Sequence, residues 1–205
     1  MSENVKQQNA QASKGIGAKD LINLGVFVAI NFVIGMAVGM LGFIPIFIPL
    51  LIVIWPLIGG VAVMLYYSKV RTFGLVTLFG LLSGLLMFIG GMGLWIIGTL
   101  TLSGLIADLI LKAGGYNAAK NGVLAFAVFS VGIIGNYIPI IVSRDEYMKG
   151  LRDSGFTQDY VNALNSFLPS WMLIVLIIGG FVAGLVGGFI GKKVLAKNFK
   201  RAGLA

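Results

Sequence analysis

The chain of 205 residues contains no cysteine and no histidine, and only 11% of its residues are charged. The lack of cysteine excludes disulfides, thiol catalysis and thiolate metal sites. The lack of histidine removes the most frequent general base of active sites and the commonest metal ligand. A serine nucleophile at Ser83 would have no such base, and close helix packing better explains the small residues around it. We therefore expect no enzymatic activity.

Long hydrophobic runs dominate the remainder of the sequence, and 58% of all residues are hydrophobic. About 20 apolar residues in a helix cross the roughly 30 Å hydrocarbon core of a bilayer, so these runs predict an all-α integral membrane protein. We expect a bundle of six transmembrane helices, of which the shorter third must stand nearly upright. The expected spans are Leu21 to Phe43, Ile46 to Ser68, Phe73 to Met87, Leu94 to Leu111, Gly122 to Val142 and Trp171 to Ile190.

The basic residues predict the orientation of this bundle. If six helices alternate in direction, most of the 15 lysines and arginines fall on one side, which is cytoplasmic by the positive-inside rule. We expect a multi-pass protein of the cell membrane with both termini in the cytoplasm. Its net charge of +8 then reflects topology and attraction to anionic lipid, not nucleic-acid binding. The residues on that side are Lys6, Lys14, Lys19, Lys69, Arg71, Lys112, Lys120, Lys192, Lys193, Lys197, Lys200 and Arg201.

A single membrane domain, residues 19–205, follows a polar tail of residues 1–18 and ends in a basic tail, residues 192–205. The one long connection, residues 143–170, lies on the outer side. Within it, Ser143 and Glu146 have the spacing of a capping box, and Thr157 can cap a second helix. We expect two short amphipathic helices that fold over the bundle as a lid, although a connector lying at the membrane interface has the same pattern.

Asp108 is the only carboxylate inside a predicted span. An ionisable residue at membrane depth is a functional hypothesis by default. Lys112 follows one helical turn later, so an ion pair at the helix end is the simpler explanation, and we favour it.

Small residues recur at helical spacing in two of the spans. Such stripes permit close approach of two helices, and a stripe that faced lipid would mark a partner helix. The sixth span carries the longest, and the first span carries two pairs, Gly25 with Ala29 and Gly35 with Gly39. The residues of the longest stripe are Gly180, Ala183, Gly184, Gly187, Gly188 and Gly191.

Methionines and aromatic residues concentrate toward the outer ends of the spans. Flexible thioethers suit a pocket for an irregular apolar ligand, although methionine also fills ordinary cores. Together with nearby polar side chains they predict a substrate-binding cavity beneath the lid. The candidate residues are Met36, Met40, Met92, Trp95, Asn136, Tyr137, Arg144, Tyr147, Met148 and Trp171.

Four segments carry a resemblance to a known family: KDLINLGVFVAINFVIGMAVGMLGFIP, GLIADLILKAGGY, RDEYMKGLRDSGF and GGFIGKKVLAKNFKRAGLA. The chain resembles, from Lys19 to near its end, the Trep_Strep or MptD group of S-components, the substrate-binding subunits of energy-coupling factor (ECF) importers. The resemblance implies a six-helix receptor that captures a micronutrient outside the cell. It also implies docking on a membrane coupling protein that carries two cytosolic ATPases, followed by toppling in the membrane to release the cargo.

In S-components an AxxxA-type stripe on the first helix meets the coupling protein, and Gly25 and Ala29 occupy that pattern here. The sequence has no phosphate-binding loop of the Walker type, so ATP must be hydrolysed by another chain. We expect no intrinsic cofactor or bound metal. The cargo is either a planar apolar ligand such as haem or another tetrapyrrole, or a small vitamin whose carboxylate pairs with Arg144. A self-sufficient secondary carrier or channel, or a scaffold without a ligand, are the alternatives.

Overall fold

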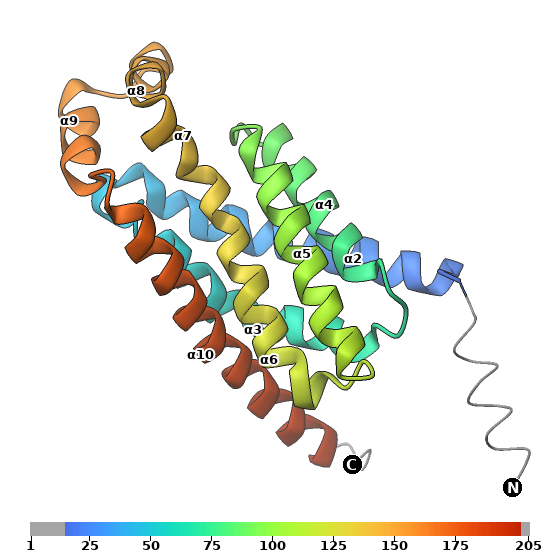
Figure 1. Cartoon of the computed structure of the whole chain (residues 1–205). Coiled ribbons are helices and arrows are strands. Elements are labelled where there is room, and N and C mark those ends of the chain that lie inside the picture. Colours follow the sequence, from blue (N-terminus) through green and yellow to red (C-terminus); the bar gives the residue numbers. More distant parts are fainter. Residues whose placement is uncertain (1–14, 202–205) are drawn as a thin grey trace, which may run out of the picture.

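The computed structural model describes residues 15–201, with side chains as far as residue 197. Over that range the chain is helical, without a strand (Figure 1). Most of the N-terminal tail and part of the C-terminal tail lie outside the described residues. The elements are α2 (Ala18–Gly39), η1 (Met40–Phe43), η2 (Pro45–Phe47), α3 (Leu51–Lys69), α4 (Leu75–Ile89), α5 (Trp95–Ala113), α6 (Ala118–Val131), η3 (Gly132–Asn136), α7 (Ile138–Val142), α8 (Arg144–Asp153), α9 (Gln158–Phe167) and α10 (Met172–Arg201).

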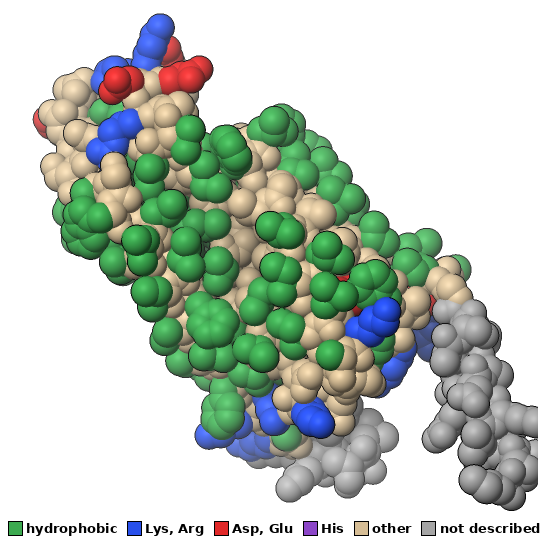
Figure 2. Space-filling model, viewed as in Figure 1, with side chains coloured by type: hydrophobic (Ala, Val, Ile, Leu, Met, Phe, Trp, Pro, Cys, Tyr) green, Lys and Arg blue, Asp and Glu red, His purple; other side chains and the backbone are tan. Residues whose placement is uncertain are grey.

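Five helical segments are long and apolar enough to cross a membrane. The sixth apolar helix, α4, has 15 residues and a length of about 22 Å, which is less than the hydrocarbon thickness of about 30 Å. A wide band of apolar side chains separates two charged ends (Figure 2). We call the end that carries the basic residues of α3, α5 and α10 the basic end, and the opposite one the α8–α9 end. The segments are Ala18–Phe43, Leu51–Lys69, Trp95–Ala113, Ala118–Asn136 and Met172–Lys197.

Glycines set the contact between α10 and its neighbours α3 and α6. A Cβ atom at Gly187 would overlap the carbonyl oxygen of Pro56, and one at Gly191 would lie 2.6 Å from the carbonyl oxygen of Gly60. On the other side, a Cβ at Gly184 would lie 2.6 Å from Cα of Ala127 in α6. Since real Cβ atoms do not approach backbone atoms so closely, only glycine fits these places. The stripe of the sixth predicted span is therefore internal packing.

The serine-containing segment of α4 is explained in the same way. A Cβ at Gly80 would overlap the carbonyl oxygen of Leu100, and one at Gly84 would lie 2.8 Å from Cα of Ile97. These small residues let α4 and α5 pack backbone to backbone. Close packing, rather than a nucleophile, accounts for the glycines around Ser83.

The small pair in the first half of α2, Gly25 and Ala29, does not pack against another helix of the described chain. Gly25 has open space where a Cβ would be, and Ala29 is exposed. Large apolar neighbours on α2, including Val26 and Val33, are also more than half exposed. None of the described residues covers this apolar face of α2, while the small residues of α10 are buried in helix contacts.

The fifth predicted span, Gly122 to Val142, is not one continuous helix. The α-helix begins earlier, at Ala118, and gives way at Gly132 to the 3₁₀ turn η3 and then to the short α7. A Cβ at Gly135 would lie 2.7 Å from Cα of Ile96, so the turn lets the chain press against α5. Pro139, near the start of α7, lacks the N–H that a continuous helix would need. The second predicted span also begins later, because η1 and η2 delay α3 to Leu51.

The connection between α7 and α10 contains the two expected amphipathic helices, α8 and α9. Thr157 caps α9 by accepting a hydrogen bond from the Tyr160 N–H at 3.3 Å, as predicted. The predicted capping box of α8 is wrong, because the Ser143 hydroxyl donates to the Pro139 carbonyl at 3.3 Å and caps nothing. Val161 and Leu164 bury the apolar face of α9 against the bundle.

Asp108 caps a neighbouring helix instead of pairing with Lys112. Its Oδ2 accepts hydrogen bonds from the backbone N–H groups of Gly74 (2.8 Å), Val76 and Thr77 (both 3.2 Å), and from the Thr77 hydroxyl at 3.2 Å. The first turn of any helix leaves such N–H groups without an internal partner. The Lys112 ammonium lies 4.8 Å from the centre of the Phe73 ring, as a cation–π contact. The expected ion pair is therefore wrong, and the carboxylate has a structural role.

Candidate functional site

An apolar pocket of about 260 Å³ opens at the α8–α9 end of the bundle. It lies between the last turns of α2, the turn η1, the end of α4 and the loop that follows α4. Four of the residues that line it are methionines, and we call it the methionine pocket. Its lining residues are Phe32, Gly35, Met36, Gly39, Met40, Phe43, Met87, Gly90 and Met92.

The pocket exists because the second small pair of α2, Gly35 and Gly39, has no side chains to fill it. A Cβ at Gly39 would meet nothing within 4 Å. At Gly35 it would touch Cε of Met87 at 3.4 Å and lie 3.9 Å from Nε1 of Trp55. Met36 and Met40 are 51% and 68% exposed, so they form a soft rim free to rearrange around a ligand.

Three of the ten predicted substrate-binding residues meet in this pocket: Met36, Met40 and Met92. The other seven do not line it. Trp95 and Trp171 are more than half exposed at the ends of α5 and α10, whereas Tyr137 and Met148 are buried in the core. Asn136 and Tyr147 are partly buried in η3 and α8.

Arg144 holds α8 and α9 together. Its guanidinium donates from Nε to the Ile140 carbonyl at 3.1 Å, from Nη1 to Oδ1 of Asn165 at 2.7 Å, and from Nη2 to the Leu168 carbonyl. The Arg144 guanidinium was predicted to pair with a ligand carboxylate, but three acceptors of the protein already bind it. The arrangement is that of a clamp between the two helices.

Two tyrosines fasten the same end of the molecule to the turns between α2 and α3. The Tyr160 hydroxyl of α9 donates to the Gly42 carbonyl at 2.7 Å, and the Tyr137 hydroxyl donates to the Ile48 carbonyl at 2.7 Å. Gly42 immediately precedes Phe43, a wall of the methionine pocket. Through this contact α9 is connected to the pocket without lining it.

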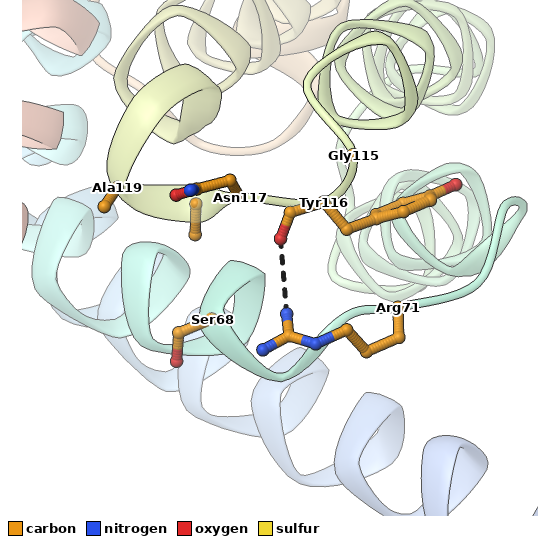
Figure 3. A pocket seen from close by; sticks show the side chains of 7 residues that line it. Ser68, Arg71, Gly115, Tyr116, Asn117 and Ala119 are labelled. Carbon is orange, nitrogen blue, oxygen red and sulfur yellow. Dashed lines mark hydrogen bonds between the residues drawn. The ribbon is translucent and has the colours of Figure 1, made fainter. Parts of the chain in front are cut away.

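A second, more polar cavity of about 440 Å³ lies at the basic end, between the end of α3 and the turn from α5 to α6. The Arg71 guanidinium donates there to the Val70 carbonyl at 2.9 Å. It also donates to the Tyr116 carbonyl at 3.3 Å (Figure 3). Burial and the nearby Asp108 carboxylate raise the pKa of Tyr116 to about 12, so its hydroxyl stays protonated. None of the predicted substrate-binding residues lines this cavity, and its arginine joins two connections of the fold.

Three buried polar residues lie next to residues of the methionine pocket without lining it themselves, and the sequence prediction missed them. Asn31 precedes Gly35 by one turn on α2, Ser83 precedes Met87 by one turn on α4, and Trp55 faces Gly35 from α3. Each of the three is 3% exposed. Asn31 was detectable as an amide in the middle of an apolar span, whereas Trp55 has no signal that separates it from an ordinary core residue.

The described residues contain no group of three or more acidic side chains that could hold a metal ion. Neither the curated proteins nor the solved structures include a match to the chain. The sequence model of one family, described as hypothetical bacterial integral membrane protein (Trep_Strep), matches residues 18–201. That range includes every helix that forms the bundle and the methionine pocket. The chain therefore belongs to the Trep_Strep family of bacterial integral membrane proteins.

Proposed function

We propose that this chain is the substrate-binding S-component of an ECF-type importer in the cell membrane. It captures a micronutrient outside the cell and relies on a membrane coupling protein and two cytosolic ATPases for uptake. In this proposal α4 completes six spans, α8 and α9 form a lid, and the chain itself hydrolyses nothing. The resemblance of the sequence to S-components and the membership of the Trep_Strep family are compatible with this role.

The charge distribution supports an outward-facing pocket. Lysines of α3, α5, α6 and α10 gather at the end of the bundle opposite α8 and α9 (Figure 2). By the positive-inside rule that end is cytoplasmic, which leaves the methionine pocket and the lid helices outside. A receptor that collects a scarce nutrient needs its binding site on this side.

The uncovered face of α2 is the observation that carries the proposal. Without an interhelical hydrophobic effect, helices associate in lipid through close packing, and small residues allow it. Gly25 and Ala29 supply such a surface near the basic end, and no part of the described chain covers it. A coupling protein is the partner that an S-component requires at this place.

The size of the pocket favours the smaller of the two cargo classes. Pockets for drug-sized ligands range over roughly 300–1,000 Å³, and the methionine pocket holds about 260 Å³. A compact ligand fits within that space, whereas haem would require the methionine rim and Phe43 to move. Since Arg144 is already engaged by three acceptors, a ligand carboxylate is not needed to satisfy it.

Purification of the tagged chain from its native membrane tests the proposal. We expect a membrane protein and two ATPases with phosphate-binding loops to co-purify, together with a small molecule detectable by visible absorbance or mass spectrometry. Gly25→Leu with Ala29→Leu should remove the protein partners and leave the small molecule bound. Gly98→Leu, at an open position on α5, is the matched control. Retention of all partners by the double variant would contradict the proposed docking face.

A further inference from the structure

We propose that the methionine pocket recognises a compact, uncharged ligand with an apolar body, whose inner end exchanges hydrogen bonds with Trp55, Asn31 and Ser83. This inference rests on the proposed function, because it names the substrate class of the same outward-facing site. It concerns residues that no part of the resemblance assigns.

Gly35 is the position where the pocket meets the buried indole. It lines the pocket, and the space that its missing side chain would occupy lies 3.9 Å from Nε1 of Trp55. The Trp55 ring is held from behind by Phe126 and Phe129 of α6, with ring centroids 6.1 and 6.3 Å away. The indole is therefore fixed with its N–H toward α2 and the pocket.

The polar atoms at this depth have no partner within the described chain. Trp55 Nε1, Asn31 Oδ1 and Ser83 Oγ are all buried and make no hydrogen bond there. A buried polar group without a partner costs about 1–3 kcal/mol in mutational data, so three on adjacent helices are unusual.

Two other buried serines of the bundle do find partners among the described residues, although the buried hydroxyl of Tyr67 does not. Ser103 and Ser130 are equally buried, yet they donate to the carbonyls of Leu100 at 3.1 Å and Phe126 at 2.8 Å. Thr101 does the same to Ile97 at 2.6 Å. Serine and threonine readily satisfy themselves within a helix in this way. Ser83 does not, although it lies in the interior of α4.

The donor and acceptor types define the ligand. The indole N–H can only donate, the Asn31 Oδ1 can only accept, and a serine hydroxyl does either. The inner end of the ligand must therefore present both an acceptor and a donor, as an amide, a lactam or a hydroxylated heterocycle does. Neither the pocket lining nor the three polar residues carries a charge. A charged group would lose its hydration without gaining a counter-charge there.

Tryptophan emission offers a local measurement of this site. The chain has 3 tryptophans, so Trp95→Phe with Trp171→Phe leaves Trp55 as the sole emitter. The protein in lipid nanodiscs is titrated with benzamide, ethylbenzene and benzoate, which share one ring and differ in the polar end. We expect benzamide to change the Trp55 emission saturably. Benzoate should bind at least about tenfold more weakly, because the site has no counter-charge.

Variants separate the polar inner end from the apolar pocket. Asn31→Leu and Ser83→Ala should each weaken benzamide binding by roughly 2- to 10-fold, the effect of one lost hydrogen bond, and leave ethylbenzene binding within about twofold. Gly35→Leu should abolish binding of both. Ser103→Ala, which removes an already bonded hydroxyl, is the matched control and should change neither.

A second readout distinguishes a ligand site from a structural one. Removing a buried polar atom that lacks a partner should leave the unliganded thermal midpoint of Asn31→Leu and Ser83→Ala unchanged or higher, while binding falls. Should Asn31→Leu fail to fold, Ser83→Ala alone decides the question.

Three results would overturn the inference: no saturable benzamide signal, tighter binding of benzoate than of benzamide, or unchanged benzamide affinity in both variants. The last would mean that the pocket recognises only the apolar body of its ligand. These results leave the co-purification of coupling protein and ATPases untouched. Conversely, benzamide binding without co-purifying partners would refute the proposed importer and preserve this site.

Discussion

At the scale of single residues, Asp108 shows how a charge can be structural at a helix end within the membrane bundle. Its carboxylate accepts four hydrogen bonds from the first turn of α4, and so replaces the cap that Gly74, which has no side chain, cannot supply. A negative charge is also favourable beside the positive end of a helix dipole. Both effects place Asp108 among the residues that hold α4 against α5.

Asp108→Ala should destabilise the protein by roughly 2–4 kcal/mol, because it leaves several buried N–H groups without an acceptor. Asp108→Asn should cost less, since the amide oxygen still accepts. Lys112→Gln is the control and should cost under about 1 kcal/mol, the range of an exposed cation–π contact. Thermal unfolding in detergent measures all three. Equal losses of stability in Asp108→Ala and Lys112→Gln would instead indicate that Asp108 acts through an ion pair with Lys112.

The same residue shows where sequence reasoning ends. Lys112 is one turn from Asp108, and local spacing can suggest only such near neighbours. The actual partners, at Gly74 to Thr77, are 31 to 34 positions away and become neighbours through the packing of α4 on α5. The uneven distribution of methionines pointed to Met36 and Met40, and the structure places both in the lining of the methionine pocket. The contact of Trp55 with Gly35 left no trace in the sequence.

At the scale of elements, the crossing of α3 and α10 depends on backbone contact. Gly187→Ala should be severely destabilising, because its Cβ would overlap the Pro56 carbonyl and neither backbone can give way. Overpacking of this kind costs about 1–3 kcal/mol or more. Gly98→Ala, on α5 with open space around it, should be neutral or slightly stabilising. Thermal midpoints and the monodisperse fraction in size-exclusion chromatography measure the difference, and a tolerated Gly187→Ala would contradict the packing.

The break between α6 and α7 was not predictable from local pattern. Hydropathy stays high from α6 through Ile140, so the sequence resembles one continuous helix. The turn η3 arises because Gly132 and Gly135 press against α5, a tertiary contact that hydropathy does not record. The amphipathic pattern of α9, by contrast, is local, and its cap at Thr157 was predicted correctly.

Arg144→Gln should loosen α8 and α9 without unfolding the bundle. It removes charged hydrogen bonds to Asn165 and the Leu168 carbonyl, and their loss should lower the free energy of local opening by about 1–3 kcal/mol. Hydrogen–deuterium exchange of residues 158–167 should accelerate while exchange in α3 and α10 is unchanged. Lys149→Gln, on the exposed side of α8, is the control. If hydrogen–deuterium exchange were unchanged in Arg144→Gln, Arg144 would not be needed to hold α9 and would be available to bind a ligand.

At the scale of the whole molecule, the absence of cysteine makes the orientation easy to test. Lys149→Cys and Lys193→Cys place single exposed thiols on α8 and α10, at opposite ends of the bundle. The positive-inside rule predicts that a membrane-impermeant maleimide labels Lys149→Cys in intact cells, and Lys193→Cys only after permeabilisation. The reverse pattern would place the methionine pocket in the cytoplasm and exclude its role in capture.

The whole molecule is thus proposed to be a receptor whose pocket faces outward and whose movement is driven by other chains. Uptake by reconstituted vesicles tests this most directly, with the small molecule that co-purifies with the protein supplied in labelled form. We predict that the chain alone binds this molecule without accumulating it, and that vesicles containing the coupling protein and ATPases accumulate it only with ATP. Sustained accumulation by the chain alone would contradict the account.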